Sequence, residues 1–423
     1  MKLITTGPQV LNGDVAVSGA KNSATRVLAA SMLTDQPVRL RNFPLELEDG
    51  KAKMGFLRRM GAEIEVLAEN SELDIQAQAL SFDPIDDFEL PIRTTYLLAA
   101  GALAREGRAR VPYPGGCKIG SRGYDLHMMV WEKLGCEVVE TDAYIDVKGR
   151  LTGSLIDFPL STVGGTENAL MCASVAEGET LIHNAYVTPE VHDLIAFLRE
   201  MGAVIVQEGA SQIRIQGAGG LLRGADFKIM SDRIEALTWI VMGALSGGAM
   251  RISNVPFETM EVPFIHLRDC GLDLYRNSGE VLVSPNCIGP WGLQPFELAC
   301  GTHPGVITDM QTFYVLLALF ANGRSKIFDY RYPERIAYVR ELARFAPGAL
   351  EAEPGKITIN GRAKLVGAKG LSTDLRGSMT LVMAALLAEG ESEVTGVEMA
   401  LRGYNALDKK LAALGAECVW IPD

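Results

Sequence analysis

The stretch RTTYLLAAGALAREGRARVPY at residues 93–113 carries a pattern that is repeated along the whole chain. Its central part, LLAAGALA at 97–104, is apolar on every side, which is typical of a helix buried all round. A short turn with Gly107 and then an apolar strand follow it. Related sequences begin at residues 22, 166, 233, 310 and 376. The pattern therefore predicts six buried helices, each leading into a strand.

A second pattern alternates with the first and consists of an amphipathic helix, a glycine turn and an apolar strand. One copy is FLRRMGAEIEV at 56–66, where Gly61 stands at the position of a left-handed helix C-cap. The glycines recur about every 70 residues, a longer period than that of solenoid repeats. We therefore expect six small α+β lobes. The glycines of the other copies are Gly135, Gly202, Gly271, Gly348 and Gly415.

Length and composition limit the class of protein. A chain of 423 residues is too long for one ordinary core, so we expect the six lobes to form two domains of an α/β (α+β) protein. The composition, 48% hydrophobic and 22% charged, is that of a soluble globular protein, and no apolar run reaches the length of a membrane helix. The first residues lack the pattern of an export signal, which predicts a cytoplasmic protein.

Charge and metal-binding residue types exclude further classes. The net charge of −12 argues against sequence-independent binding of nucleic acid, which needs a positive surface. Seven cysteines occur without a C-x-x-C pair, and five histidines show no metal spacing. We therefore expect no disulfide framework, no metal and no cofactor, and an anionic ligand would need local cations to hold it.

One loop has the composition of a reactive site: VPYPGGCKIGSRGYDLH at 111–127. Glycines around Cys117 allow close backbone approaches, and Lys118 and Arg122 favour a thiolate over a thiol. Such a cysteine is able to donate a proton or to act as a nucleophile. The alternative is a Pro/Gly surface turn that holds a small buried cysteine.

Polar residues stand at the start of each predicted buried helix. A helix N-terminus carries partial positive charge and unpaired N–H groups, so six such ends facing one cleft would attract an anion. Asp232, Asp309 and Asp374 are alternatively explained as N-caps. Capping does not explain the cations at these ends, which need an anionic ligand or the neighbouring aspartates as partners. These cations are Lys21, Arg93, Arg233 and Arg376.

Six segments spread over the chain match one family. They are SGAKN at 18–22, PGGCKIGSR at 114–122, SDRIE at 231–235, TDMQ at 308–311, TDLRGS at 373–378 and RGYNALDKKLAALGA at 402–416. With these segments in register from end to end, the chain resembles the UDP-N-acetylglucosamine enolpyruvyl transferases of the EPSP synthase superfamily. The resemblance implies two inside-out α/β barrel domains, each of three lobes around buried central helices. It implies one discontinuous domain, 1–20 with 231–423, and a second, 21–230, that carries the loop 111–127.

The resemblance also implies a reaction. Enzymes of this family transfer the enolpyruvyl group of phosphoenolpyruvate to the 3-hydroxyl of UDP-N-acetylglucosamine and release phosphate, the first committed step of peptidoglycan synthesis. Cys117 would protonate the methylene carbon or add covalently, and Asp309 would be the general base on the acceptor hydroxyl. Lys21 would be catalytic as well as binding. The residues expected to bind phosphoenolpyruvate are Lys21, Arg93, Arg122, Arg335, Arg376 and Arg402.

The acceptor site departs from the family pattern at some positions. Gly123 and Tyr124 replace a proline and its neighbour in the uridine-binding segment, and Leu160 stands where a lysine is usual. Loss of that lysine should weaken binding of a diphosphate, while Tyr124 offers a ring that can stack on uracil. The expected acceptor contacts are Asn22, Arg93, Arg122, Asp125, Leu126, Thr162, Val163, Gly164 and Asp309.

Two alternatives follow from these departures. One is a paralogous enolpyruvyl transferase that acts on another acceptor, such as uridine monophosphate; shikimate 3-phosphate fits less well, because the cysteine loop and Asn22 belong to the nucleotide-sugar branch. The other is a non-catalytic duplicate, whose signature would be loss of Lys21, Cys117, Asp309 or Arg402, and all four are present. The expected partners are phosphoenolpyruvate and a nucleotide sugar, without nucleic acid or membrane.

Overall fold

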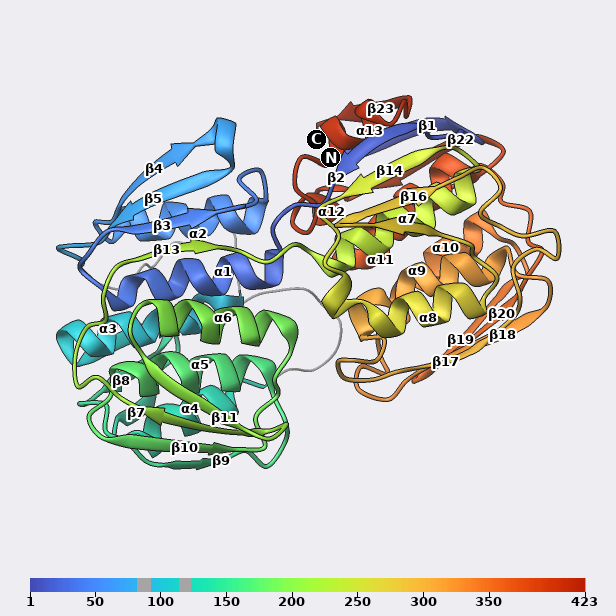
Figure 1. Ribbon diagram of the computed structural model, residues 1–423. Coiled ribbons are helices and arrows are strands. Elements are labelled where there is room, and N and C mark those ends of the chain that lie inside the picture. Colours follow the sequence, from blue (N-terminus) through green and yellow to red (C-terminus); the bar gives the residue numbers. More distant parts are fainter. Residues whose placement is uncertain (82–92, 114–122, 423) are drawn as a thin grey trace. The chain divides into compact units, whose positions relative to one another are not determined.

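The chain divides into two compact units, which are coloured along the sequence in Figure 1. The structure is a computed structural model and describes residues 1–81, 93–113 and 123–422, with the side chains of residues 93 and 94 left aside. Within these ranges, unit 1 comprises residues 1–18 and 231–422, and unit 2 comprises the described part of 19–230. None of the helices in the described ranges is long and apolar enough to cross a membrane.

Unit 1 contains three four-stranded sheets with one common topology. In the first, β2 (Gly13–Ala16) pairs parallel with β14 (Met250–Ser253), and β16 (Glu280–Val283) and β15 (Tyr275–Asn277) follow antiparallel. The other two sheets repeat this order. They are β17 (Glu297–Cys300), β18 (Arg324–Asp329), β20 (Lys356–Asn360) and β19 (Leu350–Glu353), and β21 (Lys369–Leu371), β22 (Gly390–Thr395), β1 (Lys2–Gly7) and β23 (Cys418–Ile421).

Unit 2 repeats the same topology in two sheets and, within the described residues, has a third sheet of three antiparallel strands. The four-stranded sheets are β13 (Ala225–Lys228), β3 (Val38–Arg41), β5 (Glu72–Gln76) and β4 (Glu63–Leu67), and β9 (Leu155–Asp157), β10 (Glu179–His183), β12 (Gln212–Gln216) and β11 (Val204–Glu208). The three-stranded sheet is β6 (Arg108–Pro112), β8 (Tyr144–Lys148) and β7 (Glu137–Glu140).

The apolar helices lie inside the units, as the sequence predicts. In unit 1, α7 (Arg233–Ser246), α9 (Thr308–Leu319) and α11 (Leu375–Leu387) contact one another and are buried over almost their full length. In unit 2, α3 (Leu98–Glu106) contacts both α1 (Lys21–Ala30) and α5 (Val163–Val175). A 3₁₀ turn, η3 (Arg93–Leu97), leads into α3. Each unit has its own cluster of buried hydrophobic residues.

The amphipathic helices pack with one face on this interior. In α10 (Ala337–Phe345), Tyr338, Leu342 and Phe345 are buried, a spacing that places them on one side of the helix. The six turn glycines all have positive φ, for example 102° at Gly61. Five of them directly follow the last turn of a helix, which confirms the predicted C-caps. The prediction is wrong for Gly348, because α10 ends with its C-cap at Ala346 and Gly348 lies in the turn that follows. The remaining elements are α2 (Glu48–Arg59), α4 (Asp125–Lys133), α6 (Pro189–Glu200), α8 (Glu261–Asp269), α12 (Glu398–Leu401), α13 (Leu407–Ala413), η1 (Ser31–Leu33), η2 (Ala68–Asn70) and η4 (Phe257–Thr259).

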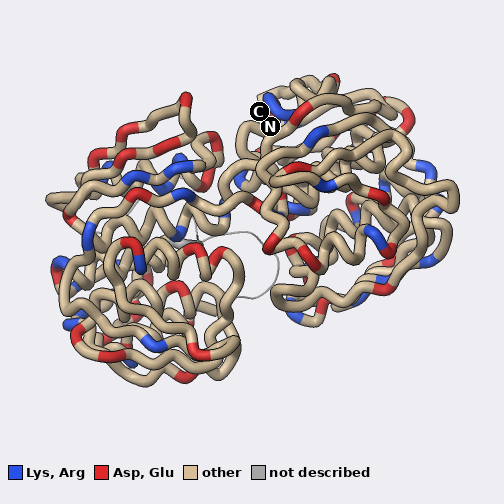
Figure 2. Tube along the Cα trace, viewed as in Figure 1, with Lys and Arg blue, Asp and Glu red and all other residues tan. Residues whose placement is uncertain are grey.

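Charged residues of both signs are interspersed over both units (Figure 2). Many of them pair across neighbouring strands, as Arg39 on β3 does with Asp74 on β5 at 2.6 Å. Exposed pairs of this kind contribute little to stability. The charges that bear on function are the buried ones.

Candidate active site

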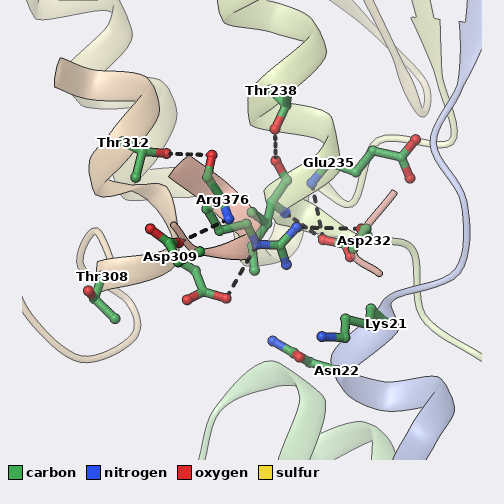
Figure 3. Close-up of polar contacts among 12 residues, drawn as sticks. Lys21, Asn22, Asp232, Glu235, Thr238, Thr308, Asp309, Thr312 and Arg376 are labelled. Atoms are coloured by element: carbon green, nitrogen blue, oxygen red, sulfur yellow. Dashed lines mark hydrogen bonds and ion pairs between the residues drawn. The ribbon is translucent and has the colours of Figure 1, made fainter. Parts of the chain in front are cut away.

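The N-terminal ends of α7, α9 and α11 carry the three aspartates singled out in the sequence. Two of them, Asp232 and Asp309, are labelled in Figure 3. Asp232 caps α7, because its Oδ1 accepts the N–H groups of Ile234 at 2.8 Å and Glu235 at 3.1 Å. Asp374 caps α11 in the same way through its Oδ1. Asp309 is the second residue of α9, and that helix has no side-chain cap. The capping interpretation is therefore correct for two of the three aspartates.

The carboxylate of Asp309 is instead paired with two arginines. Arg335 donates from Nη1 to its Oδ1 at 2.8 Å, and Nε of Arg376 lies 3.5 Å from its Oδ2. Nη2 of Arg335 donates at 2.8 Å to Asp374, so Arg335 bridges the starts of α9 and α11. The Arg335 side chain is only 2% exposed, whereas that of Asp309 is 24% exposed. The cluster thus presents a carboxylate to solvent in front of buried cations.

Aromatic and backbone contacts hold Arg376. Its guanidinium lies over the ring of Tyr404, 5.3 Å from the centroid, and Nη1 contacts the carbonyl oxygen of Gly403 at 3.5 Å. The Tyr404 hydroxyl shares a 2.8 Å hydrogen bond with Thr238 on α7. Burial by itself lowers the pKa of Arg376, but Tyr404 and the nearby carboxylates outweigh it and raise the pKa. Arg402, the C-cap of α12, directly precedes this Gly403.

In unit 2, Lys21 begins α1 and is paired with a buried carboxylate. Its Nζ lies 3.0 Å from Asp49 of α2, and Asp49 is 3% exposed. One turn later on α2, Lys53 is fully buried and donates to the carbonyl oxygen of Thr25 at 2.8 Å. Burial lowers the pKa of Lys53 to about 7; the charge of Arg26 adds to this shift, while Glu167 and Asp49 oppose it. A buried ionic cluster therefore supports Lys21.

The same cluster reaches Asn22. Arg26 on α1 pairs with Glu167 on α5 at 2.9 Å and contacts the Asn22 Oδ1 at 3.4 Å. Glu167 is almost fully buried, and burial raises its pKa against the opposing charge of Arg26. The Asn22 amide is thus oriented by a residue that is itself tied to α5.

The acceptor residues expected at the starts of α4 and α5 lie on two packed helices. Thr162 is the N-cap of α5 and accepts from the N–H of Gly165 at 3.3 Å. A Cβ on Gly164 would lie 3.1 Å from Nε2 of His127, so this glycine allows α5 to approach α4 closely. The contact joins the first turn of α4, which begins with Asp125 and Leu126, to the first turn of α5, which follows its cap Thr162 with Val163 and Gly164.

Two tyrosines flank the segment 114–122 and share one carboxylate. The hydroxyl of Tyr124 donates to Oε2 of Glu140 at 2.9 Å, and that of Tyr113 lies 3.4 Å from the same atom. Their ring centroids are 5.5 Å apart. Sequence reasoning found Tyr124 but missed Glu140, an acidic residue near a strand end with no distinguishing signal.

The expected site residues divide between the units. Cys117, Arg122 and the side chain of Arg93 lie outside the described residues. Asp49 was also missed, because a carboxylate in the first turn of a helix is ordinary. Among the described residues, no group of three or more His, Cys, Asp or Glu side chains is arranged to hold a metal ion. Unit 1 carries Asp309, Arg335, Arg376 and Arg402, and unit 2 carries Lys21, Asn22, Asp125, Leu126, Thr162, Val163 and Gly164.

Comparison with known proteins identifies the family. Residues 5–411 match the family EPSP synthase (3-phosphoshikimate 1-carboxyvinyltransferase). The UDP-N-acetylglucosamine 1-carboxyvinyltransferase of Novosphingobium aromaticivorans is 37% identical over 426 residues, 98% of each chain, and that of Campylobacter hominis is 38% identical over 417 residues, 97% of each.

Solved structures agree with this assignment. The enolpyruvyl transferase NikO from Streptomyces tendae matches with a TM-score of 0.90 and 25% identity over 99% of this chain and 98% of that one. EPSP synthase from Acinetobacter baumannii, at 18% identity and a TM-score of 0.77 over the full length of both chains, shares the fold. The chain therefore belongs to the EPSP synthase (3-phosphoshikimate 1-carboxyvinyltransferase) family and is a carboxyvinyl-transferring enzyme.

Proposed function

We propose that this enzyme transfers the enolpyruvyl group of phosphoenolpyruvate to the 3-hydroxyl of UDP-N-acetylglucosamine in the cytoplasm. The sugar oxygen bonds to C2 of phosphoenolpyruvate while C3 gains a proton, and phosphate then leaves as C3 loses a proton. The observation that carries the proposal is the partly exposed carboxylate of Asp309, held at a buried helix start by Arg335 and Arg376. The names of relatives that are 36–38% identical over nearly the whole chain support the choice of acceptor.

Asp309 is the proposed general base. A general base has to be held within reach of the hydroxyl proton, and the contacts from Arg335 and Arg376 fix the position of the Asp309 carboxylate. Arg335 keeps its charge although it is buried, because Asp374 and Asp309 raise its pKa against the effect of burial. Proton transfer to a positioned base contributes roughly 10²–10⁴ in rate.

The proposed cations for phosphoenolpyruvate differ in how strongly they are already engaged. Both Nη atoms of Arg335 already donate to carboxylates at 2.8 Å, so its main role in the site is to hold Asp309. Besides its place over the Tyr404 ring, Arg376 makes two polar contacts of 3.5 Å, at the long limit of a hydrogen bond. Because these contacts are longer than those of Arg335, we propose that Arg376 binds the substrate carboxylate. Lys21, Arg93, Arg122 and Arg402 complete the proposed set.

The acceptor is proposed to bind at Asn22 and at the starts of α4 and α5. The N-terminus of α5, with its Thr162 cap and Gly164, offers N–H groups to a diphosphate. Leu160, in the turn ahead of α5, is 63% exposed and supplies no charge there. Binding of the diphosphate then depends on backbone donors and on residues of the 111–127 loop.

Phosphate release measured against three acceptors tests the proposal. The enzyme is given phosphoenolpyruvate with UDP-N-acetylglucosamine, uridine monophosphate or shikimate 3-phosphate in parallel. We expect phosphate release that depends on UDP-N-acetylglucosamine and is lost in Asp309→Asn. Release only with uridine monophosphate would assign the enzyme to a different acceptor, and release with none of the three would contradict the proposed reaction.

A further inference from the structure

Asp329, the last residue of β18, is a buried carboxylate that is absent from the proposed reaction. Its side chain is 3% exposed, and Oδ1 accepts the backbone N–H groups of Arg331 at 3.1 Å and Tyr332 at 2.9 Å. Oδ2 accepts from Nε2 of Gln311 on α9 at 3.0 Å. Oε1 of Gln311 in turn accepts from the hydroxyl of Tyr338 on α10 at 2.9 Å. One carboxylate thus joins the turn after β18 to two helices.

These are the segments that carry Asp309 and Arg335. Gln311 follows Asp309 by two residues on α9, and Tyr338 follows Arg335 by three. The N–H of Arg335 donates to the carbonyl oxygen of Tyr332 at 3.0 Å, so the backbone of Arg335 is tied to a residue that Asp329 holds directly. Asp329 therefore sets the backbone positions from which the two side chains reach each other.

Other contacts also reach the turn. The N–H of Asp329 donates to the carbonyl oxygen of Gly355 at 3.0 Å, and the N–H of Gly355 donates to that of Pro333 at 2.9 Å. The ring of Tyr330, a residue that is 75% exposed, stacks on that of Phe328. The Asp329 carboxylate differs from these ties because it also reaches α9. The network keeps its donors and acceptors because burial raises the pKa of Tyr338 well above its ordinary value, so that its hydroxyl remains a donor.

We propose that Asp329 is a positioning residue that holds Arg335 against Asp309. The catalytic consequence rests on the proposed function, whereas the placement of Arg335 does not. Without this carboxylate, two backbone N–H groups and the Gln311 amide lose their acceptor, and a buried polar group left without a partner destabilises the conformation that buries it. The turn then relaxes and Arg335 moves with it. A displacement of about 1 Å at a catalytic group is enough to reduce turnover about 100-fold.

The chain offers a conservative variant and a matched control. In Asp329→Asn, the remaining oxygen still accepts both backbone N–H groups. A rotated Gln311 amide accepts from the new NH₂ through Oε1, and its own NH₂ donates to the Tyr338 hydroxyl, so the turn stays linked to both helices. Asp329→Ala removes it. Ser325→Ala is the control, because Ser325 lies on the same strand, is fully buried and accepts the N–H of Phe296 at 3.1 Å, without contact to the turn.

Two readouts are measured on each folded variant. We expect Asp329→Ala to lose about 100-fold in kcat for phosphate release, Asp329→Asn to recover most of it, and Ser325→Ala to stay near wild type. Phenylglyoxal labelling followed by peptide mapping reports on Arg335 itself. We expect Arg335 to be modified in Asp329→Ala and protected in the other three proteins.

Each outcome decides the proposal. If Asp329→Ala turns over like Ser325→Ala and Arg335 stays protected, the positioning role is wrong. If the wild type releases no phosphate, the proposed function fails while the labelling still decides the placement of Arg335. If Asp329→Ala does not fold, Gln311→Met replaces it, because it cuts the link to α9 but keeps the turn. A tenfold loss of kcat then supports the role, and activity equal to Ser325→Ala overturns it.

Discussion

The guanidinium of Arg335 and the carboxylate of Asp309 lie 2.8 Å apart, with the arginine buried and the aspartate partly open to solvent. A buried cation needs its counter-charge, because an uncompensated charge in the interior is costly. The pair therefore fixes the orientation of Asp309, whose side chain remains 24% exposed. A general base needs this combination of a fixed position and access for the group that gives up the proton.

Replacing Asp309 should separate chemistry from stability. Asp309→Asn removes the base but keeps an oxygen for Arg335, so we expect kcat to fall roughly 10²–10⁴-fold with a smaller change in KM. Asp309→Ala leaves two buried guanidinium groups with one partner fewer and should also unfold at lower temperature. Steady-state kinetics and thermal unfolding check both. If both variants raise KM and leave kcat unchanged, the aspartate has a structural role and is not the base.

Lys53 should give the protein a pH-dependent stability. The pKa of Lys53 is about 7 in the folded state and 10.5 ordinarily, so between these values the unfolded chain binds more protons and stability rises with pH. We expect the free energy of unfolding of the wild type, relative to Lys53→Met, to increase from pH 7 to pH 10, by an amount on the order of 5 kcal/mol over the full window.

Urea unfolding of both proteins at several pH values measures this difference. The control is Lys51→Met on the same helix, because Glu46 and Glu48 outweigh partial burial and raise the pKa of Lys51, which stays charged in both states over this window. Parallel curves for the wild type and Lys53→Met would contradict the expectation. The prediction concerns how the difference in unfolding free energy changes with pH, not its size at one pH, because Lys53→Met also removes the hydrogen bond to Thr25.

Glu140 should affect acceptor binding through Tyr124. The hydroxyl of Tyr124 donates to this carboxylate, and Asp125 of the proposed acceptor site follows directly in the chain. A hydrogen bond to a charged group is worth about 1.5–3 kcal/mol, so we expect Glu140→Ala to raise the KM for the acceptor about tenfold with less change in kcat. Glu137→Ala, an exposed residue on the same strand, is the control. If Glu140→Ala has the same KM for the acceptor as Glu137→Ala, Glu140 has no part in acceptor binding.

Cys117 should be the thiol that reacts first at neutral pH. Of the other six cysteines, five are buried and Cys418 is half-buried, and burial raises the pKa of Cys136 to about 11 and that of Cys270 to about 12. We expect one equivalent of iodoacetamide to label Cys117, with activity lost in step. Cys117→Ala should take up no label at that rate, and Cys117→Asp should keep turnover because it retains a proton donor. Prior labelling of another cysteine would contradict this reactivity.

Much of the fold was accessible from the sequence for a local reason. Whether a helix is apolar on every side, and where a glycine ends it, depend on residues only a few positions apart. The apolar run LLAAGALA therefore predicted a buried helix correctly, and Gly61 predicted the end of α2. The same locality explains why the capping alternative is correct for Asp232 and Asp374, whose partners lie two or three residues away. It is wrong for Asp309, which the sequence did not distinguish from the other two. The family resemblance added the residue types of the site.

The pairing of charges was decided by the tertiary structure alone. Arg335 meets Asp309 across 26 residues and Asp374 across 39, and Lys21 meets Asp49 across two helices, so which carboxylate serves which cation depends on how the buried helices pack. Asp329 is the clearest case, because in the sequence it is only an aspartate that ends a strand. The chain by itself determined which residues are buried and which carry charge. Packing brought those charges within 3 Å of one another, and because they are shielded from water there, the attraction within each pair is much stronger than in solvent.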